Sequence, residues 1–211
     1  MCKPSSSQLQ IAGSEAPRTL LERAAETYVL GGRRLETLQL TRKSLDGPSE
    51  GPRRLYMGNT PDSVATFLRG RRIAVAGVSR DPSQAANAVF RKLRGSGYEV
   101  FPINPKASEV EGVRCFRDVA AVPVHLDGVV IATSPDVSVQ IVRQCSDHGA
   151  RRVWFHRSFG PGSVSDEAVR ECEAHGIDCI VGGCPLMFCE PVDFGHKCMR
   201  WWLQRQGRVP K

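Results

Sequence analysis

The chain has 211 residues, 41% of them hydrophobic, which is enough to bury one substantial core with some sequence to spare. Its formal charge of +7 comes from scattered basic pairs rather than from a basic run with interleaved aromatic residues, which argues against nucleic-acid binding. With no signal-peptide pattern and no stretch of about 18 apolar residues, we expect a cytoplasmic chain that does not enter a membrane and whose eight cysteines are reduced thiols.

Residues 1–57 are predicted to be a partly disordered N-terminal extension that contains one possible helix. Pro, Ser and Gly cluster near its two ends, and Thr19 with Glu22 fits a capping box. The apolar residues that follow this cap at helical spacing are Leu20, Leu21, Ala24, Ala25 and Tyr28. The helix would serve as a regulatory or dimerisation arm, or belong to an ill-ordered extension.

Residues 58–190 alternate between apolar strands and amphipathic helices. A first helix is expected to begin with Thr60 as its cap and Pro61 at its first position. The expected strands then lie at 72–78, 98–103, 127–133, 151–156 and 177–182, with a short strand at 114–116 and a helical turn near 118–122. The helices between them are expected at about 85–95, 135–148 and 164–175.

This alternation predicts a Rossmann-like, doubly wound α/β fold, with a mainly parallel sheet and helices on both of its faces. In such a sheet the ligand lies at the carboxyl ends of the strands, near the point where the strand order reverses. The loops that start at Gly77, Ile103, Thr133, His156 and Gly182 are therefore expected to converge on one crevice.

The loop after the first strand is suited to a phosphate, because a helix N-terminus offers backbone N–H groups there. It is a poor match to the NAD fingerprint, which has three glycines at fixed spacing. Only Gly77 is present, and Ser79, Arg80, Pro82 and Ser83 follow it.

The second strand ends in "FPINPK", without the carboxylate that usually holds the ribose of NAD. Lys106, together with Arg80, would suit a phosphorylated ribose, as found in NADP or in coenzyme A. The alternative is that Lys106 is an ordinary surface lysine.

Four runs of the sequence resemble the small CoA-binding-domain proteins, which are similar to the CoA-binding domain of the succinyl-CoA synthetase alpha subunit. The runs are "IAVAGVSRDPSQAAN", "GYEVFPINPKASEVEGVRCFRDVAAVP", "DGVVIATSPDVSVQIV" and "VWFHRSFGPGSVSDEAVRECEAHGIDCIVGGCPLM". The resemblance covers about residues 60–190, and its most specific parts are the G-x-S-x-x-P loop followed by Asn87 and the P-I-N-P turn.

The resemblance implies that coenzyme A is the ligand and assigns its contacts. Around the phosphates it places Gly77, Val78, Ser79, Arg80 and Asn87, with Ser83 in the same loop. Near the adenosine end it places Asn104, Pro105 and Lys106, and against the adenine or pantetheine Thr133, Ser134, Pro135 and Val137. His156, at the end of a strand, is expected to be a polar ligand contact, with acid or base catalysis as the alternative.

No catalytic constellation accompanies these residues in the sequence. The chain has no counterpart of the synthetase's second domain, which carries its phosphorylated histidine, and no Gly-x-Ser-x-Gly elbow. The sequence and the resemblance therefore predict a protein that binds coenzyme A or an acyl-CoA without a reaction of its own. The alternative is an NADP- or nucleotide-dependent enzyme that uses the same crevice.

Residues 191–211 are predicted to form a C-terminal helix or tail that packs on the domain or on a second subunit, so that a homodimer or a partner enzyme is possible. Met199, Trp202 and Leu203 are its candidate contacts. Cys184, Cys189, His196 and Cys198 are candidate metal ligands, but they lack the C-x2-C spacing of zinc ribbons, and no metal is assigned. Cys184 is also a candidate for a mixed disulfide with the CoA thiol.

Overall fold

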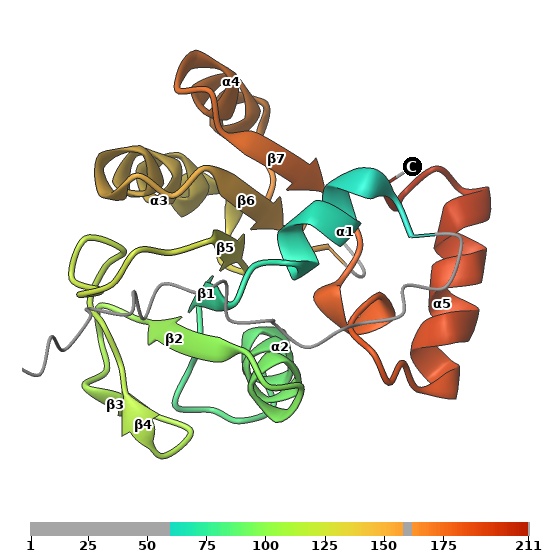
Figure 1. The fold of residues 1–211 in the computed structure, drawn as a ribbon, viewed down its shortest axis with the longest axis horizontal. Helices are drawn as coiled ribbons and strands as arrows, with labels where there is room; N and C mark the ends of the chain where they lie inside the picture. Colours follow the sequence, from blue (N-terminus) through green and yellow to red (C-terminus); the bar gives the residue numbers. More distant parts are fainter. Residues whose placement is uncertain (1–59, 158–161, 211) are drawn as a thin grey trace, which may run out of the picture. The chain divides into compact units, whose positions relative to one another are not determined.

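A parallel sheet of five strands, in the order β2-β1-β5-β6-β7, forms the centre of the structure (Figure 1). The computed structural model describes residues 60–157 and 162–210, so the expected helix near Thr19 lies outside the described residues. The strands are β1 (Arg72–Ala76), β2 (Glu99–Ile103), β5 (Gly128–Ile131), β6 (Arg152–Phe155) and β7 (Asp178–Val181).

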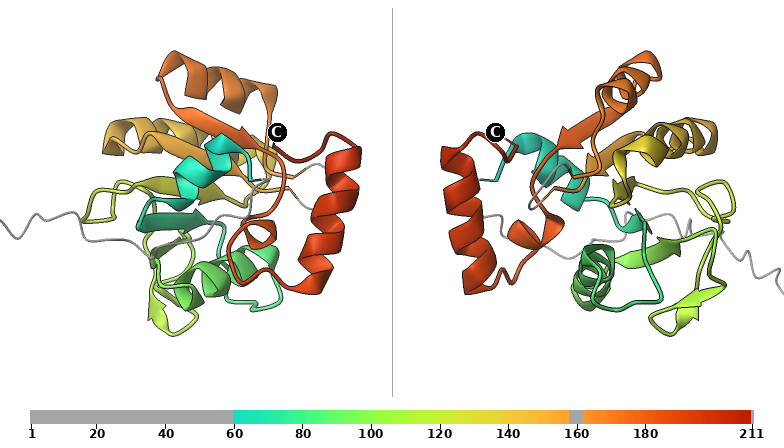
Figure 2. Two further views of the ribbon diagram at one scale, coloured as in Figure 1. Left: turned by 45° about the vertical axis from the view of Figure 1, so that its right-hand side comes forward. Right: turned by 180° about the vertical axis from the view of Figure 1, so that it is seen from behind.

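Helices cover both faces of this sheet (Figures 1 and 2). On one face lie α1 (Asp62–Leu68), α2 (Ala85–Gly95), the short 3-10 helix η2 (Pro185–Met187) and α5 (Phe194–Arg205). On the other face lie α3 (Pro135–His148) and α4 (Asp166–Ala174). The doubly wound, Rossmann-like α/β fold predicted from the sequence is confirmed.

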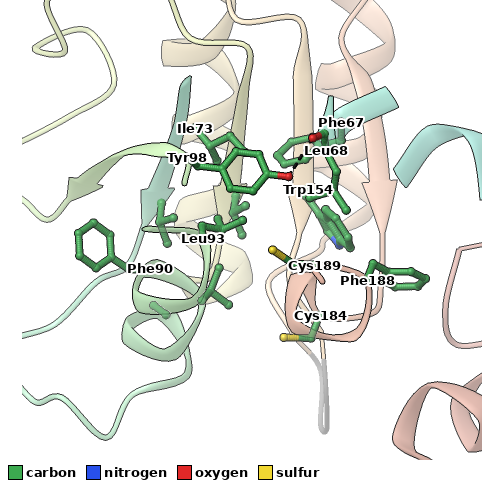
Figure 3. Packing of buried hydrophobic residues seen from close by; sticks show 14 of the residues in the cluster. Phe67, Leu68, Ile73, Phe90, Leu93, Tyr98, Trp154, Cys184, Phe188 and Cys189 are labelled. Atoms are coloured by element: carbon green, nitrogen blue, oxygen red, sulfur yellow. Dashed lines mark hydrogen bonds between the residues drawn. The ribbon is translucent and has the colours of Figure 1, made fainter. Parts of the chain in front are cut away.

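The strands supply two hydrophobic clusters because alternate side chains point to opposite faces. Toward α1 and α2, Trp154 packs edge-to-face on Phe67 with ring centroids 5.4 Å apart, and its indole N–H donates to the Gly182 carbonyl at 3.0 Å. The hydroxyl of Tyr98 donates to the Leu68 carbonyl at 2.8 Å (Figure 3). Both polar atoms of these aromatic side chains are therefore paired within the core.

The second cluster fills the space between the sheet and the pair α3 and α4. Ala74, Ile131 and Phe155 point into it from the strands, and Val142 and Cys172 meet them from the helices. Since β1 and β5 are buried on both faces, they read as continuous apolar runs, which is why their sequence predicted central parallel strands.

Most element boundaries agree with the sequence prediction, and α3 begins and ends where it was expected. Pro61 is the N-cap of α1 rather than its first helical residue. The hairpin of β3 (Glu109–Val110) and β4 (Val113–Arg114) was not predicted beyond a short strand, because each strand has only two residues. Among the described residues, no helix combines the length and the apolar character needed to cross a membrane.

The C-terminal segment packs against the end of β7. A Cβ atom on Gly182 would lie 2.7 Å from the Arg208 carbonyl oxygen, so the segment passes directly over this glycine. Leu203 of α5 is 1% exposed, and the Arg200 guanidinium donates to the Met187 carbonyl at 3.2 Å. Of the predicted contacts of this tail, Leu203 and Met199 face the domain, whereas Trp202 is 46% exposed.

Candidate functional site

A hollow of about 610 Å³ lies at the carboxyl ends of β1, β2 and β5. The sheet reverses its order at β1, which pairs with β2 on one side and β5 on the other, so this is the place where ligands bind in doubly wound folds. The predicted site residues that line it are Gly77, Asn104, Pro105, Lys106, Thr133, Ser134 and Val137. Three of the five expected loops therefore converge.

Gly77 lets the first of these loops pass close to β5. Its φ of +100° lies in the region that L side chains rarely adopt, and an added Cβ would meet the Ala132 carbonyl oxygen at 2.6 Å. The Gly77 N–H donates to the Ile103 carbonyl at 3.1 Å. The lone glycine is thus required by the backbone between β2 and β5.

The loop after Gly77 is held by hydrogen bonds to Asn87, a residue of α2 that is 1% exposed. Its Oδ1 accepts the Ser79 N–H at 2.8 Å, and its Nδ2 donates to the Ser79 carbonyl at 2.7 Å. A buried carboxamide bound in this way fixes the backbone of the loop on both sides of one residue. Asn87 therefore braces the loop in the structure, and its role as a direct CoA contact stays a prediction.

Glu111, in the turn between β3 and β4, completes this brace. Its Oε1 accepts from Asn87 Nδ2 at 2.8 Å and from Arg91 Nη1 at 2.6 Å. Glu111 has a φ of +50°, a value that is uncommon for residues other than glycine. The hairpin is thereby tied to the loop across 24 residues of sequence, a contact that no local pattern could have revealed.

The loop that precedes α2 contains an acidic residue. Asp81 accepts from the Ser83 N–H at 3.0 Å and from the Ser83 hydroxyl at 2.7 Å, and from the Gln84 side chain at 2.9 Å. The hydrogen bonds from Gln84 and Ser83 lower the pKa of this carboxyl group. The two donors of Ser83 are directed to Asp81, while Arg80 is exposed, and both remain predicted contacts.

Asn104 joins the β1 loop to the β2 loop. Its Nδ2 donates to the Val78 carbonyl at 2.7 Å, and its Oδ1 accepts the Lys106 N–H at 2.8 Å. Val78 itself is fully buried, so its side chain belongs to the core. The arrangement sets the turn that carries Lys106, whose exposed side chain lines the hollow.

One side of α3 forms the opposite wall. Ser134 is the N-cap and Pro135 the first residue of this helix. Val137 is 39% exposed at the hollow, and Gln140, Ile141 and Gln144 line it further along the helix. The sequence analysis missed these last three, although their spacing of three, four and seven residues from Val137 places them on one helical face.

Arg117 and Asp118 were also missed, and they complete the electrostatics of the hollow. The Arg117 Nε lies 2.9 Å from Asp118 Oδ2, and Asp118 Oδ1 accepts the Ala121 N–H at 2.8 Å. The Arg117 side chain is 82% exposed, so this ion pair is weak and its cation can turn toward a ligand. Two cations, from Lys106 and Arg117, thus border the hollow beside a carboxylate that is held in place.

His156 and Cys184 do not line the hollow. Burial lowers the pKa of His156, so its imidazole is neutral at pH 7. Its carbonyl accepts the N–H of Ser163 at 3.1 Å, and the Ser163 hydroxyl donates to the Ile131 carbonyl at 2.6 Å. Cys184 is 3% exposed and packs in the core cluster with Phe188 and Cys189 (Figure 3).

The candidate metal ligands of the tail are not gathered. Within residues 60–157 and 162–210, no group of three or more His, Cys, Asp and Glu side chains is arranged to hold a metal ion. His196 instead binds Asp193, with 2.6 Å between Nδ1 and Oδ2, and Cys189 donates to the Ser96 hydroxyl at 3.3 Å.

Known proteins have sequences similar to the part of the chain that forms the sheet and its helices. A sequence model of the family described as "CoA binding domain" matches residues 71–190. The alpha subunit of ADP-forming acetate–CoA ligase II from Pyrococcus furiosus is 31% identical over 106 residues, which are 50% of this chain and 23% of the ligase subunit. The uncharacterized protein YneT from Bacillus subtilis is 25% identical over 116 residues, or 55% of this chain and 83% of YneT.

Among solved structures, a hypothetical protein from Pyrococcus horikoshii OT3 superposes with a TM-score of 0.58 at 28% identity. The superposition covers 68% of this chain and 98% of that one. The chain thus matches nearly the whole of a small protein, but less than a quarter of the ligase subunit.

Proposed function

Because the chain belongs to the family of CoA-binding domains, we propose that it binds coenzyme A or an acyl-CoA in the hollow at the carboxyl ends of β1, β2 and β5. The observation that carries the proposal is the meeting of three loops around this hollow, with Lys106 at its rim. A hollow of about 610 Å³ is within the ordinary range for small-molecule sites.

The ligand would lie across the hollow with its phosphates toward the β1 loop and its adenosine end toward the β2 loop. Lys106 would pair with the 3′-phosphate, and Asn104 would keep the turn that presents it. Val137 and Ile141 of α3 offer an apolar wall to the adenine or the pantetheine. Ser79, Arg80 and Ser83 would supply contacts at the outer end of the phosphates.

The protein would act through binding rather than through a reaction of its own. The titratable side chains among the described residues that line the hollow are Lys106, Arg117 and Asp118. This lining offers Asp118 neither a histidine nor a second carboxylate with which it could form an acid–base pair. The module would then serve as a carrier or sensor of CoA, or as a partner of a larger enzyme.

Titration calorimetry of the full chain with CoA, acetyl-CoA and NADPH tests this proposal. CoA and acetyl-CoA are expected to bind at micromolar concentration, and NADPH much more weakly. Binding of NADPH without binding of either CoA compound would overturn the proposal and favour an NADP-dependent enzyme. Incubation with acetyl-CoA, followed by assay of free thiol, tests the second part, since release of CoA would show a hydrolytic reaction.

A further inference from the structure

The outward face of α5 carries a stripe of exposed side chains, which we call the α5 stripe: Phe194, Cys198, Trp201, Trp202 and Arg205. The three aromatic side chains are 82%, 56% and 46% exposed, in chain order. The Arg205 guanidinium lies over the Trp201 ring, 4.1 Å from its centroid. Spacings of three, four and seven residues put these side chains on one face, opposite the buried Leu203.

Three large aromatic side chains exposed on one helix are unusual for a surface that contacts only solvent. Single exposed apolar residues are normal, but a contiguous apolar patch marks an interaction site. Tryptophan, phenylalanine and arginine are also residue types that concentrate at the centres of protein interfaces. The helix is firmly attached through its other face, so the stripe is presented on a rigid element.

The two tryptophans of the stripe both lie in the C-terminal half of the helix. The exposed residues of the N-terminal half are Phe194, Gly195, Lys197 and Cys198, so two of the four are small. A Cβ on Gly195 would have only the Asp193 carboxylate nearby, so space is open beside this residue. In an antiparallel pair of identical helices, the tryptophans of each would therefore lie beside Gly195 and Cys198 of the other.

The charges favour the same arrangement. Asp193, whose side chain is 63% exposed, precedes the helix, and Arg205 ends it. An antiparallel pair brings Asp193 of one copy next to Arg205 of the other, whereas a parallel pair would place like charges together. Phe194 would face the same Arg205, which gives the guanidinium a second aromatic partner.

We propose that the α5 stripe is a dimerisation surface, on which a second copy of this chain docks its own α5 in antiparallel orientation. The two-fold axis would pass near Met199 and Arg200, at the middle of the helix. Each contact would occur twice, as an isologous interface requires. The inference is independent of CoA binding, because none of the stripe residues lines the hollow.

The main alternative occupant is an anionic lipid surface, since residues 194–211 contain five basic residues and no acidic residue. A second copy is favoured because it would bring the Asp193 carboxylate to Arg205 and apolar side chains to the tryptophans, and because Arg200 is turned to the domain. The Arg200 guanidinium donates to Met187 and lies 5.5 Å from the Phe188 ring centroid, on the side facing the domain.

Sedimentation velocity of the full chain over a hundredfold range of concentration tests the proposal. The chain is expected to show a monomer–dimer equilibrium, and Trp202→Ser should raise the dimer dissociation constant at least about tenfold. Gln204→Ser, an exposed change on the same helix but beside the stripe, should leave the equilibrium unchanged. Circular dichroism of both variants shows whether the fold is kept.

A second readout follows from the two-fold axis, which would place the Cys198 thiols of the two copies close together. A short bismaleimide should cross-link the chain to a dimer, and Cys198→Ser should abolish the product. A chain that is monomeric throughout overturns the proposal, as does a dimer that Trp202→Ser leaves unchanged. Binding of the monomer to phosphatidylserine vesicles, lost in Trp202→Ser, would assign the stripe to a lipid surface instead.

Discussion

The side chain of Asn87 forms two hydrogen bonds with the backbone of Ser79, accepting its N–H at 2.8 Å and donating to its carbonyl at 2.7 Å. The loop that is expected to hold the phosphates of CoA is therefore shaped by a buried side chain beneath it. Glu111 holds the same carboxamide, so the shape of the loop depends on the β3–β4 hairpin as well.

Replacing this side chain should damage both the loop and the fold. We expect Asn87→Ala to lower the free energy of unfolding by about 2 to 3 kcal/mol, because it leaves buried partners without hydrogen bonds. The affinity for CoA should also fall, and by more than the fraction of unfolded chain accounts for. Urea unfolding and calorimetry measure the two effects, and Gln84→Ala, an exposed amide in the same region, is the control. Unchanged stability in Asn87→Ala would remove the bracing role.

The lone glycine of the loop gives a second prediction. Gly77→Ala combines an unfavourable φ of +100° with a contact of 2.6 Å to a carbonyl oxygen, whereas Gly97 has a φ of +84° and open space around it. We expect Gly97→Ala to cost about 1 kcal/mol of stability, and Gly77→Ala to cost clearly more. Thermal unfolding of both variants measures the difference. Equal losses would show that the backbone angle alone requires Gly77.

The hydrophobic pattern was sufficient to predict the sheet and its helices, because β1 and β5 are apolar throughout and α3 has clear start and stop signals. The hairpin next to the site was missed, since two-residue strands leave no periodicity. The partners of Asn87 are separated from it by 8 and 24 residues, and such contacts exist only in the folded chain. Trp202 was expected to pack on the domain or on a second subunit, and it is 46% exposed, because the rotation of a helix depends on packing that the pattern does not specify.

Lys106 should distinguish CoA from its dephosphorylated form. If its ammonium group pairs with the 3′-phosphate, Lys106→Ala should weaken the binding of CoA by about 1 to 3 kcal/mol. The binding of dephospho-CoA should remain nearly unchanged. Calorimetry with both ligands measures this, and Lys92→Ala is the matched control outside the hollow. An equal loss for both ligands would contradict the assigned contact.

His156 should make the fold sensitive to acid. Burial lowers its pKa in the folded state, so the unfolded chain binds the proton more readily. The stability that this neutral imidazole contributes is present above its unfolded pKa of about 6.5, and is lost as the pH falls below that value toward the folded pKa. Urea unfolding between pH 7.5 and 5 should show this decline, and His156→Gln should reduce it. A decline of the same size in both proteins would assign it to other groups.

Six of the seven predicted residues that line the hollow come from the turns after strands, where the fold itself fixes the position, and Val137 lies in the first turn of α3. Gln140, Ile141 and Gln144 could have been included once Val137 was chosen, because they share its helical face. Arg117 and Asp118 could not, since the segment between the hairpin and β5 has no regular structure that would place it.

The most direct test of CoA binding in this hollow compares two exposed valines. Val137 is 39% exposed and lines the hollow, and Val181, 42% exposed at the end of β7, lies outside it. Calorimetric titration with CoA should show binding to the wild-type chain and to Val181→Glu, and no detectable binding to Val137→Glu, whose carboxylate would stand in the apolar wall that receives the adenine or the pantetheine. Equal CoA binding by all three proteins, or by none, would contradict the account.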